Sequence, residues 1–594
     1  MIGPIMEGAI SPVDTEYREC SEPLAKIFSE YGLMERRVRV EAEYLISLSE
    51  ESGVDVRDFS DGEKDMIRDL YKSFSPDDAK IIKDIEVRGY KKIKATNHDV
   101  KAVEYFIKDK LSETSLNDSL EWIHFALTSE DINNLAYGLM MKECVDNVYV
   151  DLLEKCKGDK KLKSKIRELK DIKIGGKLTG ATGNFNAHVA AYPDVDWIKF
   201  SERFVSSFGL EPKIYTTQIV PRNSYSSLFQ IIERVNNNFS KDVPLEEDEK
   251  NLSLSTSLFR HFRDKLSKSR LQRDLSCSTV LRNLGVAFAY SIAGFRNMHT
   301  EIRTEIPDNI IPVSPLNGRY YSKVKELDVE GSTGELIRDV YLPNLDKVIE
   351  KLHENSLDYK AIEMIARTHG QRAVGTTVGK EYMNFEKILA EEREELYNIS
   401  LGDEIEKEEK IYQTIIRVND ALQDLDRDFW RYISDDWFAQ EVVEGEVGSS
   451  TMAQKVNPID FENSEGNTGV ANVFLNHYVD FWAEGKEGLA YSLISLKNTL
   501  KGLNKVYPNK EKIKEALNSH PEILSEAYQT ILRREGAEMP YEQLRDLTRG
   551  KKVTIGILYG FVDELDISDE VKEELKGLTP ENYIGLAKVL VETA

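Results

Sequence analysis

The sequence predicts a mainly α-helical protein built as a bundle of long helices. Glycine and proline are scarce, at 35 and 17 of 594 residues, which favours long regular elements over many turns. Apolar residues from Ile411 to Phe429 recur at steps of three and four, which predicts a helix of about five turns with one buried face. The alternation of apolar and polar residues that is typical of strands is rare.

Other segments follow the same pattern along the chain. Residues 162–169 and 344–353 also have helical periodicity. The segments 175–186, 368–379 and 445–457 are rich in Gly, Thr, Ser and Asn, and we expect them to be loops between helices. The apolar stripes are interpreted as the core of the bundle, and they require no cofactor.

Composition excludes several functional classes. Lys and Arg number 79 against 104 Asp and Glu, and the net charge of −25 argues against a general nucleic-acid or anionic-membrane binder, although it permits one local cationic pocket. The longest apolar stretch, Leu284–Phe295, is shorter than the roughly 18–20 residues that span a bilayer. The start of the sequence lacks the pattern of a secretory signal, so we expect a cytoplasmic protein.

Cysteine and histidine give no sign of a metal site. The nine histidines form no HxH or HExxH pair, and the cysteines have neither metal-like spacing nor the density of a disulfide scaffold. We therefore expect no metal and no other cofactor. The four cysteines are Cys20, Cys144, Cys156 and Cys277.

The chain resembles itself in five ordered pairs of segments. The pairs are SPVDTEY at 11–17 with SPLNGRY at 314–320, Val148-Tyr149 with Val340-Tyr341, LKDIKIG at 169–175 with LYNISLG at 396–402, FQIIERVNN at 229–237 with YQTIIRVND at 412–420, and AYSIAGFRN at 289–297 with AYSLISLKN at 490–498. The offset changes from 303 to 192, 227, 183 and 201, so each copy lacks segments that the other retains. Chance similarity between amphipathic helices is the alternative.

We therefore expect two tandem copies that form a pseudo-dimer. The first copy, called the first half below, spans 1–310 and the second half spans 311–594, with a carboxy-terminal helical domain at about 508–594. An artefact of gene assembly is a further explanation for this order.

The strongest motif is GSSTMAQKVNPIDFENSEGN at 448–467. Its spacing predicts an anion-binding loop or a plain linker, because a Gly- and Ser-rich loop exposes backbone N–H groups. The motif also resembles the signature of the fumarase/aspartase superfamily, and its continuation points to the branch that cleaves adenylosuccinate. It departs from that pattern at Ala453 and Gln454, and the THGQ motif departs at Arg372, where proline is usual.

The family-like motifs are divided between the halves. The first half holds TNHD at 96–99, TSEDINN at 128–134, TTQIVP at 216–221 and SRLQRDLSCSTVLRNLG at 269–285. The second half holds SPLNGRY, ARTHGQ at 366–371 and the 448–467 loop. Neither half has a complete set, but together they contain each motif once.

The resemblance implies elimination of fumarate from adenylosuccinate, leaving AMP, and cleavage of the related succinyl-carboxamide ribotide of purine synthesis. It implies Ser450 as the base, His369 as the acid at the departing nitrogen, and Lys455 with Asn457 as ligands of the succinyl carboxylate that His98 helps to orient. The groups implied to bind the phosphate and the neighbouring carboxylate are Arg273, Ser278, Arg282, Arg319 and Tyr320. The remaining implied substrate contacts are Asn97, Asp99, Thr128, Ser129, Gln218, Thr368, Ser449 and Met452.

Members of the superfamily are homotetramers whose sites combine three subunits. For this chain the resemblance implies a homodimer that forms a pseudo-tetramer, with a small nucleotide as substrate. A helical pseudoenzyme or scaffold is one alternative, but it would lack the base or the acid in both halves. A sister lyase for argininosuccinate, aspartate or malate is another, but it would not need the phosphate-binding motifs.

Overall fold

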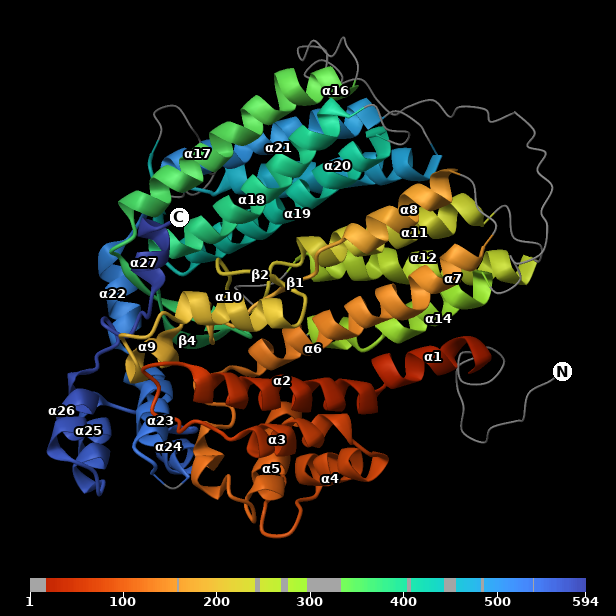
Figure 1. Cartoon of the computed structure of the whole chain (residues 1–594). Helices are drawn as coiled ribbons and strands as arrows, with labels where there is room; N and C mark the ends of the chain where they lie inside the picture. Colours follow the sequence, from red (N-terminus) through yellow and green to blue (C-terminus); the bar gives the residue numbers. More distant parts are fainter. Residues whose placement is uncertain are drawn as a thin grey trace.

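The computed structural model describes most of the chain. The described residues are 18–156, 160–240, 246–268, 276–295, 333–402, 407–442, 456–481, 485–537 and 539–594. Long helices stack side by side in layers (Figure 1), and the all-α bundle predicted from the sequence is confirmed.

The first half contains a helical domain and a set of bundle helices. Its helices are α1 (Arg18–Phe28), α2 (Glu30–Glu50), α3 (Asp61–Lys72), α4 (Pro76–Val87), α5 (Asp99–Leu111), η2 (Asn117–Trp122), α6 (Ser129–Cys144), η3 (Val145–Tyr149), α7 (Val150–Lys155), α8 (Lys160–Asp171), α9 (Asn186–Ala191), α10 (Trp197–Ser207), α11 (Asn223–Phe239), α12 (Glu246–Leu266), α13 (Ser276–Leu281) and α14 (Leu284–Phe295).

The second half adds another set of bundle helices and then several shorter ones. They are α16 (Thr333–Leu336), η4 (Ile337–Tyr341), α17 (Leu342–Asp358), α18 (Val378–Leu401), α19 (Lys407–Ser434), α20 (Ile459–Phe481), α21 (Gly485–Lys505), α22 (Lys510–Asn518), η5 (Pro521–Leu524), α23 (Ser525–Arg534), α24 (Pro540–Thr548), α25 (Ile555–Glu564), α26 (Asp569–Gly577) and α27 (Ala587–Glu592).

The helices predicted from periodicity are confirmed. The stripe from Ile411 to Phe429 lies within α19, with its apolar side chains buried. The predicted helices 162–169 and 344–353 lie within α8 and α17. The Leu284–Phe295 stretch is the helix α14, which is buried on all sides rather than on one face, as its uninterrupted apolar sequence requires.

The strands within the described residues form three two-stranded sheets. These are parallel β1 (Gly175–Gly176) with β2 (Glu211–Pro212), antiparallel β3 (Glu363–Thr368) with β4 (Gln371–Thr377), and antiparallel β5 (Phe438–Gln440) with β6 (Val506–Pro508). The prediction of a loop at 368–379 is therefore wrong. Its Gly-Thr-Thr sequence at 375–377 pairs with Glu363–Ile365, and this pairing, together with burial of the strands, stabilises a hairpin that the polar composition did not predict.

Each half has its own hydrophobic core. One buried cluster extends from Leu24 to Phe295 and the other from Leu336 to Tyr583. The carboxy-terminal helices nevertheless contact the first half. Arg533 of α23 forms an ion pair with Glu104 of α5 over 2.9 Å, and both side chains are buried.

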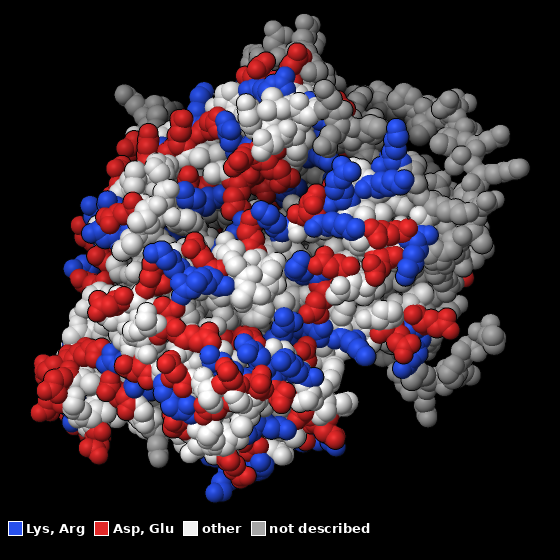
Figure 2. Space-filling model, in the orientation of Figure 1, with Lys and Arg blue, Asp and Glu red and all other residues white. Residues whose placement is uncertain are grey.

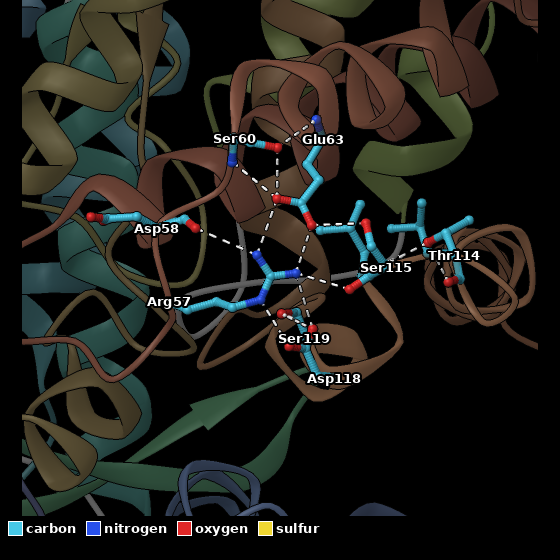
Figure 3. A network of polar contacts seen from close by, with 10 residues as sticks. Arg57, Asp58, Ser60, Glu63, Thr114, Ser115, Asp118 and Ser119 are labelled. Carbon is cyan, nitrogen blue, oxygen red and sulfur yellow. Dashed lines mark hydrogen bonds and ion pairs between the residues drawn. The ribbon is translucent and has the colours of Figure 1, made fainter.

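An exposed polar network connects the loop that precedes α3 to the start of α3 and to η2 (Figure 3). The Arg57 guanidinium bonds Glu63 at 2.8 Å and Asp118 of η2 at 2.8 Å, and Ser115 donates to Glu63. Because these groups face water, the network fixes a local conformation and adds little stability.

Charged residues of both signs are interspersed over the face shown in Figure 2. Among the described helices, none is both long and apolar enough to cross a membrane.

Candidate active site

The TNHD motif forms the start of α5. Asn97 has a left-handed backbone with φ of 50°, which asparagine tolerates, and it leads into His98 as the N-cap of the helix. The Nδ1 atom of His98 accepts the backbone N–H of Lys101 at 3.2 Å. An Nδ1 that accepts a hydrogen bond carries no proton, so this cap places the ring proton on Nε2.

His98 therefore presents a hydrogen-bond donor beside the TSED motif. Its Nε2 lies 3.4 Å from the Oγ of Ser129, the first residue of α6. Burial lowers the pKa of His98 below its usual value of 6.5, and this favours a neutral ring at pH 7. A neutral Nε2–H donor suits the orientation of a carboxylate better than it suits proton transfer.

Asp99 joins two arginines beside this histidine. Its Oδ2 lies 2.7 Å from Arg37 and 3.5 Å from Arg282. Burial alone would raise the pKa of Asp99, but the charge of Arg37 outweighs it and the pKa is lowered. Arg37 also donates to Asn133 of α6 at 2.9 Å, so it ties the TNHD and TSED segments together. Arg37 lies in no recognisable motif, so its sequence context did not indicate a role at the site.

A buried carboxylate, Asp131, organises the TSED turn. It accepts the N–H of Thr128 at 3.0 Å and the N–H of Thr179 at 3.1 Å, and it lies 2.9 Å from Lys177 Nζ. Asp131 and Lys177 are fully buried, which sequence alone could not show. Thr128 and Ser129 are thus held on a rigid turn.

Gln218 of the TTQI motif is largely buried, with 8% of its surface exposed. Its Oε1 has no hydrogen-bond partner within the described part of the chain, which leaves an acceptor for a ligand. Next to this segment, a cavity of about 100 Å³ is lined by Thr216 and Thr217 from the first half and by Glu381 and Asn384 from the second.

His369 and Thr368 belong to the β3–β4 hairpin of the second half. Thr368 ends β3, and His369 occupies the exposed turn with φ of 53°. Arg367 anchors the hairpin by an ion pair with Asp435 at 3.0 Å, next to the end of α19. His369 therefore lies at the exposed end of the hairpin, next to its buried strands.

Several predicted site residues lie outside the described part of the chain. These are Ser449, Ser450, Met452, Lys455, Arg319, Tyr320 and Arg273. Ser278 belongs to the backbone of α13, but its side chain is not described, and Asn457 lies just before α20. The structure thus assembles His98, Asp99, Ser129 and Arg282 within the first half.

Comparisons with known proteins identify the relatives of this chain. A lyase family model matches residues 329–408, and the adenylosuccinate lyase C-terminal model matches 485–584. Adenylosuccinate lyases of Haemophilus influenzae and of Escherichia coli K12 are each 29% identical over 636 aligned positions, which cover 98% of this chain and 98% of each relative. A fumarate lyase structure from Mesorhizobium sp. BNC1 is 16% identical, with a TM-score of 0.36, over 62% of this chain and 94% of that one.

The helical fold, the two family-model matches and the full-length similarity to the two adenylosuccinate lyases define a lyase of the fumarase/aspartase superfamily. Within that superfamily, the chain belongs to the adenylosuccinate lyase family.

Proposed function

We propose that this enzyme cleaves adenylosuccinate to AMP and fumarate, and that it also cleaves the succinyl-carboxamide ribotide of purine synthesis. The observation that carries the proposal is the full-length similarity to adenylosuccinate lyases, together with the His98, Asp99 and Ser129 cluster. All four cysteines are free thiols, which agrees with the reducing cytoplasm as the location of the enzyme.

The reaction is an elimination. Ser450 removes the proton from the carbon beside the succinyl carboxylate, the electron pair forms the fumarate double bond, and the C–N bond breaks. His369 gives a proton to the departing nitrogen. Lys455 and Asn457 hold the carboxylate, and His98 donates from Nε2 to orient it.

The other predicted residues bind the phosphate and the remaining groups of the substrate. Arg282, with Arg273, Ser278, Arg319 and Tyr320, binds the phosphate and its neighbouring carboxylate. The other proposed contacts are Asn97, Asp99, Thr128, Ser129, Gln218, Thr368, Ser449 and Met452.

In the same proposal, the chain consists of two tandem copies, each of which lacks segments that the other retains. Equivalent buried hydrogen bonds in the two halves support this relationship. Tyr149 bonds Ser291 at 2.9 Å, and Ser291 bonds Asn236 at 2.7 Å. In the second half Tyr341 bonds Ser492 at 2.9 Å, and Ser492 bonds Asn419 at 2.5 Å. The offsets of 192, 201 and 183 are those of three sequence pairs.

The backbone around these tyrosines supports the same equivalence. Each of them ends a single π-helical turn, η3 in the first half and η4 in the second. A π-helical turn is rare in proteins, so its recurrence with the same offset of 192 residues favours common descent over chance similarity.

Because each half lacks some of the family motifs, a complete active site needs residues from both halves. The second half supplies Ser450 and His369, and the first half supplies His98 and Arg273. Two chains then associate as a pseudo-tetramer of four half-units, with about half of the family's number of working sites per assembly. The cavity that both halves line beside Thr216 agrees with such sharing.

Fumarate release from adenylosuccinate by the purified chain tests this function. We expect Ser450→Ala and His98→Ala to lose most of the turnover, and the matched control His353→Ala, an exposed histidine of α17, to retain it. Turnover that survives both active-site substitutions would refute the shared site.

A further inference from the structure

Lys380 is a buried cation in an unfavourable place. It lies in the first turn of α18, where the helix dipole disfavours positive charge, and its side chain is fully buried. Within the described residues its ammonium bonds only neutral oxygens. Burial lowers the pKa of Lys380 to about 7, although the negative charge of neighbouring Glu381 opposes this shift. Burial of this ammonium is energetically unfavourable, so we expect Lys380 to have a specific structural role.

The ammonium of Lys380 reaches from the second half into the first. Its Nζ donates to the carbonyl oxygen of Thr216 at 3.0 Å, and to Asn384 Oδ1 on its own helix at 2.6 Å. Thr216 is two residues ahead of Gln218 in the TTQI motif. The bond therefore holds the backbone of a proposed substrate-binding segment from across the boundary between the halves.

Thr216 is also linked to the TSED turn. Its Oγ1 lies 2.7 Å from the Oγ1 of Thr179, whose N–H bonds Asp131 at 3.1 Å. Asp131 in turn accepts the N–H of Thr128. A continuous buried chain of hydrogen bonds thus joins Lys380 to both segments that carry proposed substrate contacts.

Close backbone packing transmits this restraint. Gly183 has φ of +77°, and a Cβ on it would lie only 2.0 Å from the carbonyl oxygen of Thr216. The peptide of Thr216 is therefore pressed against this glycine and held by Lys380 on another side, so it has little freedom to rotate.

We propose that Lys380 is a positioning residue, which fixes Gln218 and the TSED turn of the first half for substrate binding from its place in the second half. It acts through Thr216 and makes no contact with substrate. This inference rests on the proposed function, and it adds a direct structural dependence of the first-half site on the second half.

The test compares Lys380→Met with Lys351→Met in the full-length enzyme. Lys351 lies in α17 of the second half, is partly exposed and pairs with Glu354 at 3.5 Å, away from the Thr216 segment. We expect Lys380→Met to raise KM for adenylosuccinate about tenfold with a smaller change in kcat, because a hydrogen bond to a charged group positions a binding residue. Lys351→Met should match the wild type in both constants.

A double-mutant cycle with Gln218→Ala separates positioning from general loss of stability. If Lys380 acts through the Gln218 segment, the double variant has a KM no higher than that of the weaker-binding single variant. If the increase in KM in the double variant instead equals the product of the increases in the two single variants, the inference is overturned. Thermal unfolding of each variant is recorded alongside, and Thr179→Val, which breaks the next bond in the chain, replaces Lys380→Met if that variant does not fold.

Two further outcomes distinguish the positioning role of Lys380 from the proposed cleavage of adenylosuccinate. A wild-type enzyme that releases no fumarate overturns both. An active wild type with an unchanged KM in Lys380→Met, or in Thr179→Val where that variant replaces it, overturns the positioning role alone.

Discussion

The guanidinium of Arg417 donates to the amide oxygen of Gln230 over 2.6 Å and joins α19 to α11. Arg234 of α11 makes the reciprocal bond to Gln413 of α19. The two arginines and the two glutamines are each 183 residues apart, and each arginine also pairs with a glutamate, Glu395 or Glu168. Such reciprocity is typical of a two-fold interface between related subunits.

Removal of Arg417 should strongly destabilise this interface. Arg417 and Glu392 are both buried and lie 2.9 Å apart, so Arg417→Ala leaves a buried carboxylate without its partner. We expect a loss of about 3–5 kcal/mol in the free energy of unfolding, measured in urea. Arg427→Ala on the same helix removes an exposed pair with Glu465 and should cost at most about 1 kcal/mol. Equal costs for the two variants would contradict this account.

The two tyrosine networks should contribute equally. Tyr149→Phe and Tyr341→Phe each remove one buried hydroxyl that bonds a serine, Ser291 or Ser492. Both tyrosines are fully buried, so each change should cost about 1–2 kcal/mol of unfolding free energy. Tyr397→Phe, at a half-exposed tyrosine of α18, should have no measurable cost. Costs for the two networks that differ severalfold would argue against their equivalence.

Glu526 should make stability depend on pH. Burial raises the pKa of Glu526 to about 7, and Tyr583 donates to it at 2.6 Å. Between its unfolded value of 4.5 and about pH 7 the folded state binds the additional proton, so this group destabilises the fold as pH rises through that window.

Glu526→Gln therefore should stabilise the enzyme by up to about 3 kcal/mol at pH 8 and have little effect at pH 4. Thermal unfolding of both forms across pH measures the difference. Glu573→Gln, an exposed carboxylate of α26, is the control and should show no pH-dependent gain. A gain that is the same at both pH values would show that ionisation of Glu526 is not its cause.

His98 combines a structural and a chemical role that two substitutions can separate. Asparagine at this position keeps an N-cap acceptor for Lys101 N–H, whereas alanine removes it. His98→Asn should retain stability and lose turnover, and His98→Ala should lose turnover and about 1 kcal/mol of unfolding free energy. If His98→Asn retains full turnover, the proposed role of the Nε2–H donor is wrong.

Local sequence patterns predicted the helical class and three individual helices but missed the hairpin. Helical periodicity in α8, α17 and α19 depends on neighbours within a few residues, so it is readable from the chain. The β3–β4 hairpin is stabilised by its pairing and burial, and its polar composition resembles that of a loop. The motifs identified His98, Ser129 and Gln218, whereas Arg37 stands in no motif and is recognised only by its contact with Asp99.

By itself the sequence determined the helical class, the ordered internal similarities and the division of the family motifs between the halves, because these depend on local order along the chain. Only the tertiary structure decided which distant groups meet. Lys380 and Thr216 are 164 residues apart, and Arg533 and Glu104 are 429 apart. Contacts of this kind depend on how whole helices pack and on which polar groups are buried together. The local periodicity of the sequence contains no information about either.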